Sequence, residues 1–172
     1  FDLNADAHIY HEIAETALNL LILKKYGRDL LASMNPIEEL SKVLRPLQKR
    51  LPTQTWRSET QIAYQQFSTP AAISFLATYL LHIRRSETVL EPSCGTGCLA
   101  VWALAAGAKV IANEIDPRRR AAASALGIQA YELDAEFIDD LLPEHLMPDI
   151  VIANPPSPQT AQVSASGLPR AA

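Results

Sequence analysis

The sequence predicts an α/β fold in which an N-terminal helical segment precedes a parallel, doubly wound sheet. Beyond residue 69, short apolar strand patterns alternate with helical patterns, the order that builds parallel sheets. Proline or glycine stands at most junctions between these patterns. The first 50 residues show helical periodicity alone. A chain of 172 residues is long enough for one domain with a core and a small appendage.

The N-terminal segment, residues 1–58, is predicted to hold two helices. The first is expected over residues 7–34, where apolar residues recur at helical spacing. Asn35 and Pro36 form a helix-start signature, because Asn caps a helix and Pro suits its first turn. Glu38 lies three residues after the cap and is expected to complete a capping box.

The second helix should run from residue 36 to about residue 50, with a kink at Pro46. Residues 52–60 are interpreted as the connector to the main domain. The two helices are expected to form a cap in front of that domain.

The main domain, residues 59–157, is predicted to contain the sheet. Its first helix begins at Thr69 and Pro70, with Thr as the cap. Strands are expected at residues 88–91, 109–115, 128–133 and 150–153. The other helices are expected at residues 97–106 and 116–127, ended by Gly107 and Gly127. Residues 158–172 lack periodicity and are expected to form a flexible tail.

Composition restricts the class of protein. No apolar run reaches the roughly 18 residues that a membrane-spanning helix needs. Cys94 and Cys98 have neither zinc-pair nor disulfide-framework spacing, so both are expected to be reduced in a cytoplasmic protein without a metal site.

Charge is distributed unevenly along the chain. The net charge of −4 argues by itself against nucleic acid as a partner. A basic stretch with no intervening acid nevertheless comprises Lys42, Arg45, Lys49, Arg50 and Arg57. It is either a phosphate-binding surface or a solvated helix face. The run Arg118, Arg119 and Arg120 is interpreted as the solvated start of a helix rather than a phosphate contact.

A glycine-containing loop follows the first strand and indicates a nucleotide-like cofactor. Gly95 and Gly97 permit a tight turn and close backbone approach just before a helix. The loop fits the dinucleotide fingerprint, and Glu114 follows about twenty residues later, where it would bind ribose hydroxyls. NAD is therefore one candidate cofactor.

Glu91, directly before this loop, favours a cationic cofactor instead. A carboxylate there can meet the sulfonium or ammonium of S-adenosylmethionine. Asp134, after the third strand, would then accept from the adenine amino group, or else only cap the next turn.

A second motif, Asn154-Pro155-Pro156-Ser157, follows the fourth strand. The Asn154 side-chain oxygen and the Pro155 carbonyl can accept both N–H bonds of a planar amine, which directs electron density to its nitrogen. Two consecutive prolines stiffen the loop. Such a site would act by positioning and electrostatics.

These segments resemble a known family. Residues 66–70 (QFSTP), 91–97 (EPSCGTG), 113–116 (NEID) and 154–156 (NPP) occur in the order typical of S-adenosylmethionine-dependent DNA adenine methyltransferases. The chain is most similar to the methylases of bacterial mobile elements and of restriction or defence systems, including the Strawberry Notch-associated type. The resemblance covers about residues 59–157 and implies a Rossmann-like methyltransferase fold, methylation of adenine N6 and DNA as the substrate.

The resemblance also implies residue roles. The methionine end would lie near Phe67, Ser68, Thr69 and Pro70 and along the loop of Glu91, Pro92, Ser93, Cys94, Gly95 and Gly97. The ribose and adenine would be bound by Glu114, Ile115 and Asp134. The target amine would be held by the catalytic loop of Asn154, Pro155, Pro156 and Ser157.

Two departures from the family pattern keep alternatives open. Ser157 replaces the aromatic residue that stacks on the flipped base. The family has seven strands and this chain offers four, so the sheet is expected to be truncated, as a fragment or with a partner subunit covering the fourth strand. The alternatives are a methyltransferase acting on RNA or protein glutamine, a non-catalytic cofactor-binding scaffold, and an NAD-dependent oxidoreductase.

Overall fold

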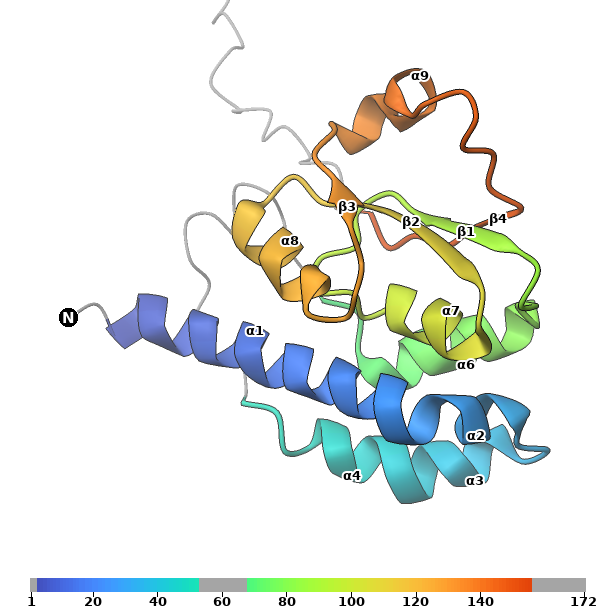
Figure 1. The fold of residues 1–172 in the computed structure, drawn as a ribbon. Helices are drawn as coiled ribbons and strands as arrows, with labels where there is room; N and C mark the ends of the chain where they lie inside the picture. Colours follow the sequence, from blue (N-terminus) through green and yellow to red (C-terminus); the bar gives the residue numbers. More distant parts are fainter. Residues whose placement is uncertain (1–2, 53–67, 156–172) are drawn as a thin grey trace, which may run out of the picture.

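The computed structural model describes residues 3–52 and 68–155 and contains one four-stranded sheet (Figure 1). The strands are β1 (Thr88–Glu91), β2 (Lys109–Asn113), β3 (Ala130–Tyr131) and β4 (Ile150–Val151). All pairings are parallel and the order is β3-β2-β1-β4. The predicted α/β class with four parallel strands is confirmed, and this order is that of the first four strands of a Rossmann-like sheet.

β1 is the centre of the sheet. Val89 is aligned with Val110 of β2 and with Ile150 of β4. Val89 and Leu90 are both buried, as expected for a parallel strand covered on two faces. On β4, by contrast, Val151 is 57% exposed, and β1 is the one strand paired with β4 in the described part of the chain.

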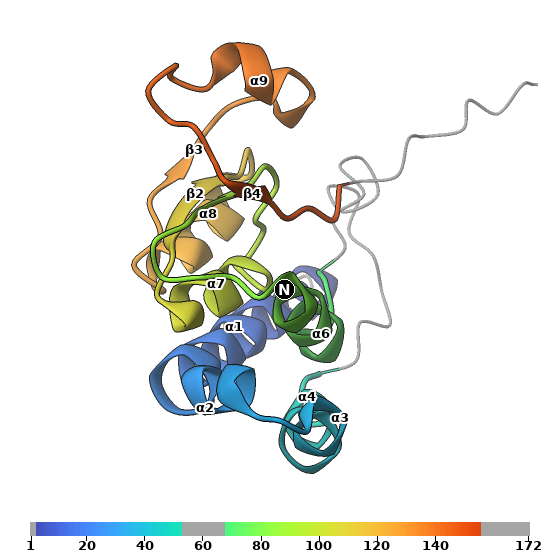
Figure 2. The same cartoon turned by 90° about the vertical axis from the view of Figure 1, so that its right-hand side faces the viewer.

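Helices lie on both sides of the sheet. Three of them, α6 (Ala71–Leu81), α7 (Ala100–Ala106) and α8 (Pro117–Ser124), lie on one side, whereas the short α9 (Ile138–Leu141) lies on the other (Figures 1 and 2). A 3-10 turn, η3 (Ala135–Phe137), leads into α9.

The first N-terminal helical run is confirmed, with a π-helical interruption. It consists of α1 (Leu3–Leu21), the π segment η1 (Ile22–Tyr26) and α2 (Gly27–Ala32). Gly27 permits the close approach of α2 to α7, because a Cβ there would lie 2.6 Å from the Cβ of Ala105.

The second run comprises α3 (Pro36–Glu39), the π segment η2 (Leu40–Leu44) and α4 (Arg45–Gln48). The break in the α-helical pattern is thus the π turn directly ahead of Pro46. Asn35 caps α3, since its side-chain oxygen accepts from the Glu38 backbone N–H at 3.3 Å. The second half of the predicted capping box is wrong. The Asn35 backbone N–H donates to Ser33 Oγ, and the Glu38 carboxylate accepts from the Asn35 side-chain amide instead.

These N-terminal helices share one hydrophobic core with the helices beneath the sheet. Four fully buried members of this cluster come from four elements: Ile22 of η1, Leu44 of η2, Phe75 of α6 and Trp102 of α7. The N-terminal helices therefore pack as an additional layer below α6 and α7 (Figure 2). The predicted boundaries at residues 58 and 157 lie outside the described residues.

Several predicted element ends shift in the structure. Thr69 does not cap α6; Pro70 holds the N-cap position, without a side-chain hydrogen bond. α7 starts three residues later than predicted because residues 95–99 form turns, and Gly107 ends it in the left-handed conformation, as predicted. Asp116 caps α8 as expected, accepting from the Arg118 backbone N–H at 2.8 Å.

β3 is shorter than predicted because a side chain replaces part of its backbone ladder. The Asn113 side chain donates to the Leu133 carbonyl at 2.9 Å and accepts from the Leu133 N–H at 2.8 Å. This pair extends the junction of β2 and β3 beyond Tyr131 without regular strand geometry.

The described ranges lack both a membrane-spanning helix and a cluster of metal-ligating side chains. Across residues 3–52 and 68–155, every helix is too short or too polar to cross a membrane. In the same ranges, no three His, Cys, Asp or Glu side chains are grouped so that they could ligate a metal ion.

Candidate functional site

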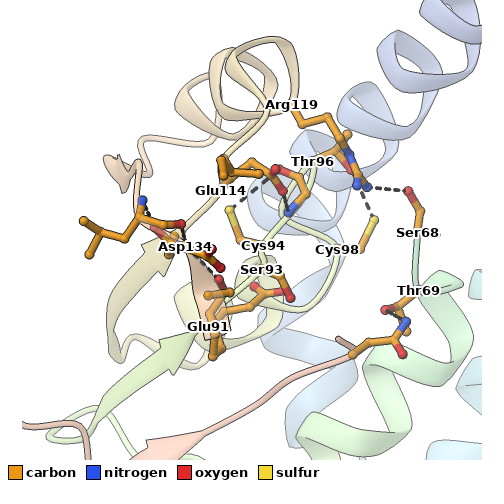
Figure 3. A pocket seen from close by; sticks show the side chains of 17 residues that line it. Ser68, Thr69, Glu91, Ser93, Cys94, Thr96, Cys98, Glu114, Arg119 and Asp134 are labelled. Carbon is orange, nitrogen blue, oxygen red and sulfur yellow. Dashed lines mark hydrogen bonds between the residues drawn. The ribbon is translucent and has the colours of Figure 1, made fainter. Parts of the chain in front are cut away.

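A cavity of about 280 Å³ lies at the carboxyl ends of the strands (Figure 3). Strand order reverses between β1 and β4, and crevices at such switch points are the usual ligand sites of open α/β sheets. Eleven of the predicted site residues line the cavity: Ser68, Thr69, Glu91, Pro92, Ser93, Cys94, Gly95, Glu114, Ile115, Asp134 and Asn154. Each strand end contributes, so residues far apart in the sequence converge.

The other predicted site residues lie elsewhere. Pro70, Gly97 and Pro155 belong to the described chain but do not line the cavity. Phe67, Pro156 and Ser157 lie outside the described residues.

The two loop glycines leave space for the protein's own side chains. Gly95 has φ +57°, and a Cβ there would lie 2.5 Å from a terminal nitrogen of Arg119. Gly97 has φ +89°, and a Cβ there would lie 2.6 Å from Cδ1 of Leu126. Both positions thus need glycine because of positive φ and internal packing, which fits the predicted tight turn, and Gly95 also lines the cavity.

Glu91 brings a buried carboxyl group to the cavity. The residue is 2% exposed, and its Oε2 has no hydrogen-bond partner among the described residues. Burial raises the pKa of Glu91 well above its usual range; a backbone hydrogen bond at Ala100 opposes this, and the Glu114 carboxylate adds to it. A positive charge placed beside this carboxyl would offset the cost of burying it in ionised form.

Glu114 ties the loop to the end of β2. Its Oε2 accepts from the Gly95 N–H at 2.7 Å and its Oε1 accepts from the Asp116 N–H at 2.8 Å. Each carboxylate oxygen has two lone pairs, so each can accept one further bond, as from a ribose hydroxyl.

Asp134 and Ile115 bring a carboxylate and an apolar side chain to the same cavity. Asp134 lines the cavity and also caps η3, its Oδ1 accepting from the Glu136 N–H at 3.0 Å. The capping role is therefore present, and Oδ2 is the oxygen left for a ligand. Ile115 is 47% exposed, which gives the cavity an apolar surface beside these polar groups.

Asn154 is oriented by Thr69. The Asn154 side-chain amide donates to Thr69 Oγ1 at 3.0 Å, and Asn154 is exposed at the rim of the cavity. This bond uses an N–H, so Asn154 Oδ1 remains an acceptor for an incoming amine. Thr69 thus positions the amide, a role that its sequence context did not indicate.

Both cavity cysteines, Cys94 and Cys98, are free thiols. Burial raises the pKa of each thiol, so neither is a reactive thiolate at neutral pH.

Sequence reasoning missed five cavity-lining residues: Cys98, Asn113, Arg119, Leu133 and Ala135. A sixth, Thr96, lies within the loop that was expected to hold the methionine end. The interpretation of all three consecutive arginines as solvated is wrong for Arg119, which is 8% exposed. The available signal was spacing, because Arg119, Ala123 and Leu126 are buried at intervals of four and three residues.

Helix α1 reaches the site with a buried polar face, which sequence reasoning also missed. Glu15 Oε2 accepts from Thr96 Oγ1 at 2.6 Å and from Ser68 Oγ at 2.8 Å. Asn19 donates from its side chain to the Thr96 carbonyl at 3.2 Å. The N-terminal helices therefore hold the loop that follows β1.

No protein-family model, curated protein or solved structure matches this chain.

Proposed function

We propose that this chain is an S-adenosylmethionine-dependent N-methyltransferase that methylates the N6 amine of adenine in DNA. The observation that carries the proposal is that Asn154 and the Glu91 carboxyl line one cavity, although 63 residues separate them. A methyl donor held by the loop after β1 and an amine held by Asn154 would meet there.

The charges around the cavity support this cofactor. Its lining carries three acidic side chains, Glu91, Glu114 and Asp134, and one cationic side chain, Arg119. S-adenosylmethionine supplies a transferable methyl group on a positively charged sulfur. NAD would instead bring two negative phosphates toward the buried Glu91 and would oppose its ionisation rather than favour it.

The remaining residues would bind the nucleoside part of the cofactor. Glu114 has acceptor capacity for ribose hydroxyls, Ile115 offers an apolar surface for the ring, and Asp134 Oδ2 would accept from the adenine amine. The cavity volume of about 280 Å³ is near the lower end of the range for small-molecule sites, about 300 Å³.

Asn154 would activate the target amine. The lone pair of an exocyclic amine is delocalised into the ring, so the amine is a weak nucleophile. Accepting one N–H at Asn154 Oδ1, held in place by Thr69, returns density to nitrogen and orients it. A base inside a duplex cannot reach this rim, so the nucleotide would be flipped out.

A basic helical surface supports DNA as the substrate. Arg45, Lys49 and Arg50 are exposed on and just after α4, and Lys42 forms an ion pair with Glu38. These basic side chains would contact the phosphates of DNA. Separately, a further polypeptide segment or a partner would cover the exposed edge of β4.

The test is methyl transfer from labelled S-adenosylmethionine to unmethylated DNA, RNA and protein. We expect label on adenine in DNA, and Asn154→Ala should reduce it by about 100-fold or more, as for loss of an oriented polar group that acts in the transition state. Binding of S-adenosylhomocysteine should be unchanged in this variant, which separates loss of catalysis from loss of fold. Label on RNA or glutamine would change the acceptor class. Cofactor binding without any transfer would contradict the proposed activity.

A further inference from the structure

Arg119 is the one cationic side chain among the described residues that line the cavity. It lies on the first turn of α8, and its side chain is 9% exposed. Burying a guanidinium is costly unless it is paired and hydrogen-bonded. Its neighbours Arg118 and Arg120 do not line the cavity and are paired with Asp116 and Glu132.

Arg119 lies at the end of the cavity formed by Ser68, opposite Asp134 (Figure 3). A terminal nitrogen of the guanidinium donates to Ser68 Oγ at 3.1 Å. The same nitrogen lies over Gly95, where any Cβ would displace it. The guanidinium is therefore held between Ser68, which precedes α6, and the loop that follows β1.

Helix α1 contributes two carboxylates that hold Arg119 and Ser68 in position. The Glu12 carboxylate lies 3.9 Å from Arg119 Nε, so it compensates the charge on that side of the guanidinium. Glu15 accepts from the Ser68 hydroxyl, which itself accepts from Arg119. A guanidinium has five N–H donors, of which the bond to Ser68 uses one.

The cavity is thus polarised along its length. Asp134, at one end, accepts hydrogen bonds, Glu91 and Glu114 are acidic, and Arg119 at the other end is a planar donor suited to a carboxylate. This layout matches an elongated ligand that carries a base at one end and an amino acid at the other.

We propose that Arg119 binds the carboxylate of the amino-acid end of the cofactor and thereby selects S-adenosylmethionine over analogues that lack this carboxylate. This inference rests on the proposed function and assigns to Arg119 a binding role; Ser68, Glu12 and Glu15 are positioning residues that hold its guanidinium.

The test compares two ligands that differ in the carboxylate alone, S-adenosylmethionine and decarboxylated S-adenosylmethionine, by calorimetric titration. The wild-type chain should bind the carboxylated ligand more tightly. Arg119→Gln should weaken binding of S-adenosylmethionine by about 10- to 100-fold, the range for loss of a charge-assisted hydrogen bond. Binding of the decarboxylated ligand should change less than about 2-fold. Arg119→Lys, which keeps the charge, should restore part of the difference.

Arg118→Gln is the matched control, because Arg118 is adjacent and does not line the cavity. It should leave both affinities unchanged. Equal affinity of the wild-type chain for the two ligands, or equal weakening of both in Arg119→Gln, would overturn the assignment and leave Arg119 a structural ion-pair partner. Should the wild-type chain bind neither ligand, the proposed function itself fails.

Discussion

Glu91 links the stability of the protein to the ligand that its cavity accepts. Burial raises the folded-state pKa of this carboxyl above its ordinary value of 4.5, so the folded chain holds the proton more tightly than the unfolded chain. The contribution of this group to the free energy of unfolding is therefore fully present below about pH 4.5. It is lost as the pH rises through the folded-state pKa.

Glu91→Gln should remove this pH dependence. As the pH rises above about 4.5, the free energy of unfolding of the wild type should fall relative to that of the variant. Denaturant titration at several pH values measures this difference. Glu144→Gln, at an exposed position, is the control and should follow the wild type. A difference between Glu91→Gln and wild type that does not vary with pH would contradict the account.

Single residues differ in how well the sequence identifies them. Glu91, Glu114, Asp134 and Asn154 were predictable because each lies at the carboxyl end of a predicted strand or directly after it, and parallel strands bring these ends together. Arg119 was not predictable, because the sequence of three consecutive arginines does not distinguish the one whose side chain is buried. That choice depends on the close approach of its guanidinium to Gly95, a contact across 24 residues.

At the scale of elements, the packing of α2 against α7 depends on Gly27. Alanine has the higher helix propensity by about 1 kcal/mol, but its methyl group would overlap Ala105. Overpacking costs about 1–3 kcal/mol, so Gly27→Ala should be destabilising overall, measured by denaturant unfolding.

A double-mutant cycle provides the control for this contact. Ala105→Gly removes the opposing methyl group, so the double variant should lose less stability than the sum of the two single variants. Strict additivity, or stabilisation by Gly27→Ala alone, would show that the two helices do not meet at this point.

The sequence predicted which segments form helices or strands more accurately than it predicted where these segments begin and end. Strands and helices were predictable from apolar periodicity and from glycine and proline positions. The end of β3 was not, because the Asn113 side chain takes over the hydrogen bonds of Leu133, 20 residues away. The π turns at η1 and η2 were not predicted either, because the apolar spacing of these segments also fits an α-helix.

At the scale of the whole molecule, the N-terminal helices and the sheet should unfold together, because their buried side chains form one cluster. Leu44→Ala, in the N-terminal layer, should cost about 2–5 kcal/mol and lower the stability reported by Trp102 in α7. The measurement is denaturant unfolding followed by circular dichroism and by fluorescence in a Trp56→Phe background, which leaves Trp102 as the reporter.

The two signals should give a single coincident transition in wild type and variant. Ile37→Ala, at an exposed position in α3, should change stability by about 0.5 kcal/mol or less. A loss of helix in Leu44→Ala that leaves the Trp102 transition unchanged would show two independent units.

The central claim concerns the ligand of the cavity at the carboxyl ends of the strands, and calorimetric titration with S-adenosylmethionine tests it most directly. We expect one binding site per chain, no competition by NAD, and at least about 10-fold weaker binding in Glu91→Gln, which removes the carboxyl that would face a cationic ligand. Binding of NAD in place of S-adenosylmethionine, or unchanged S-adenosylmethionine affinity in Glu91→Gln, would contradict it.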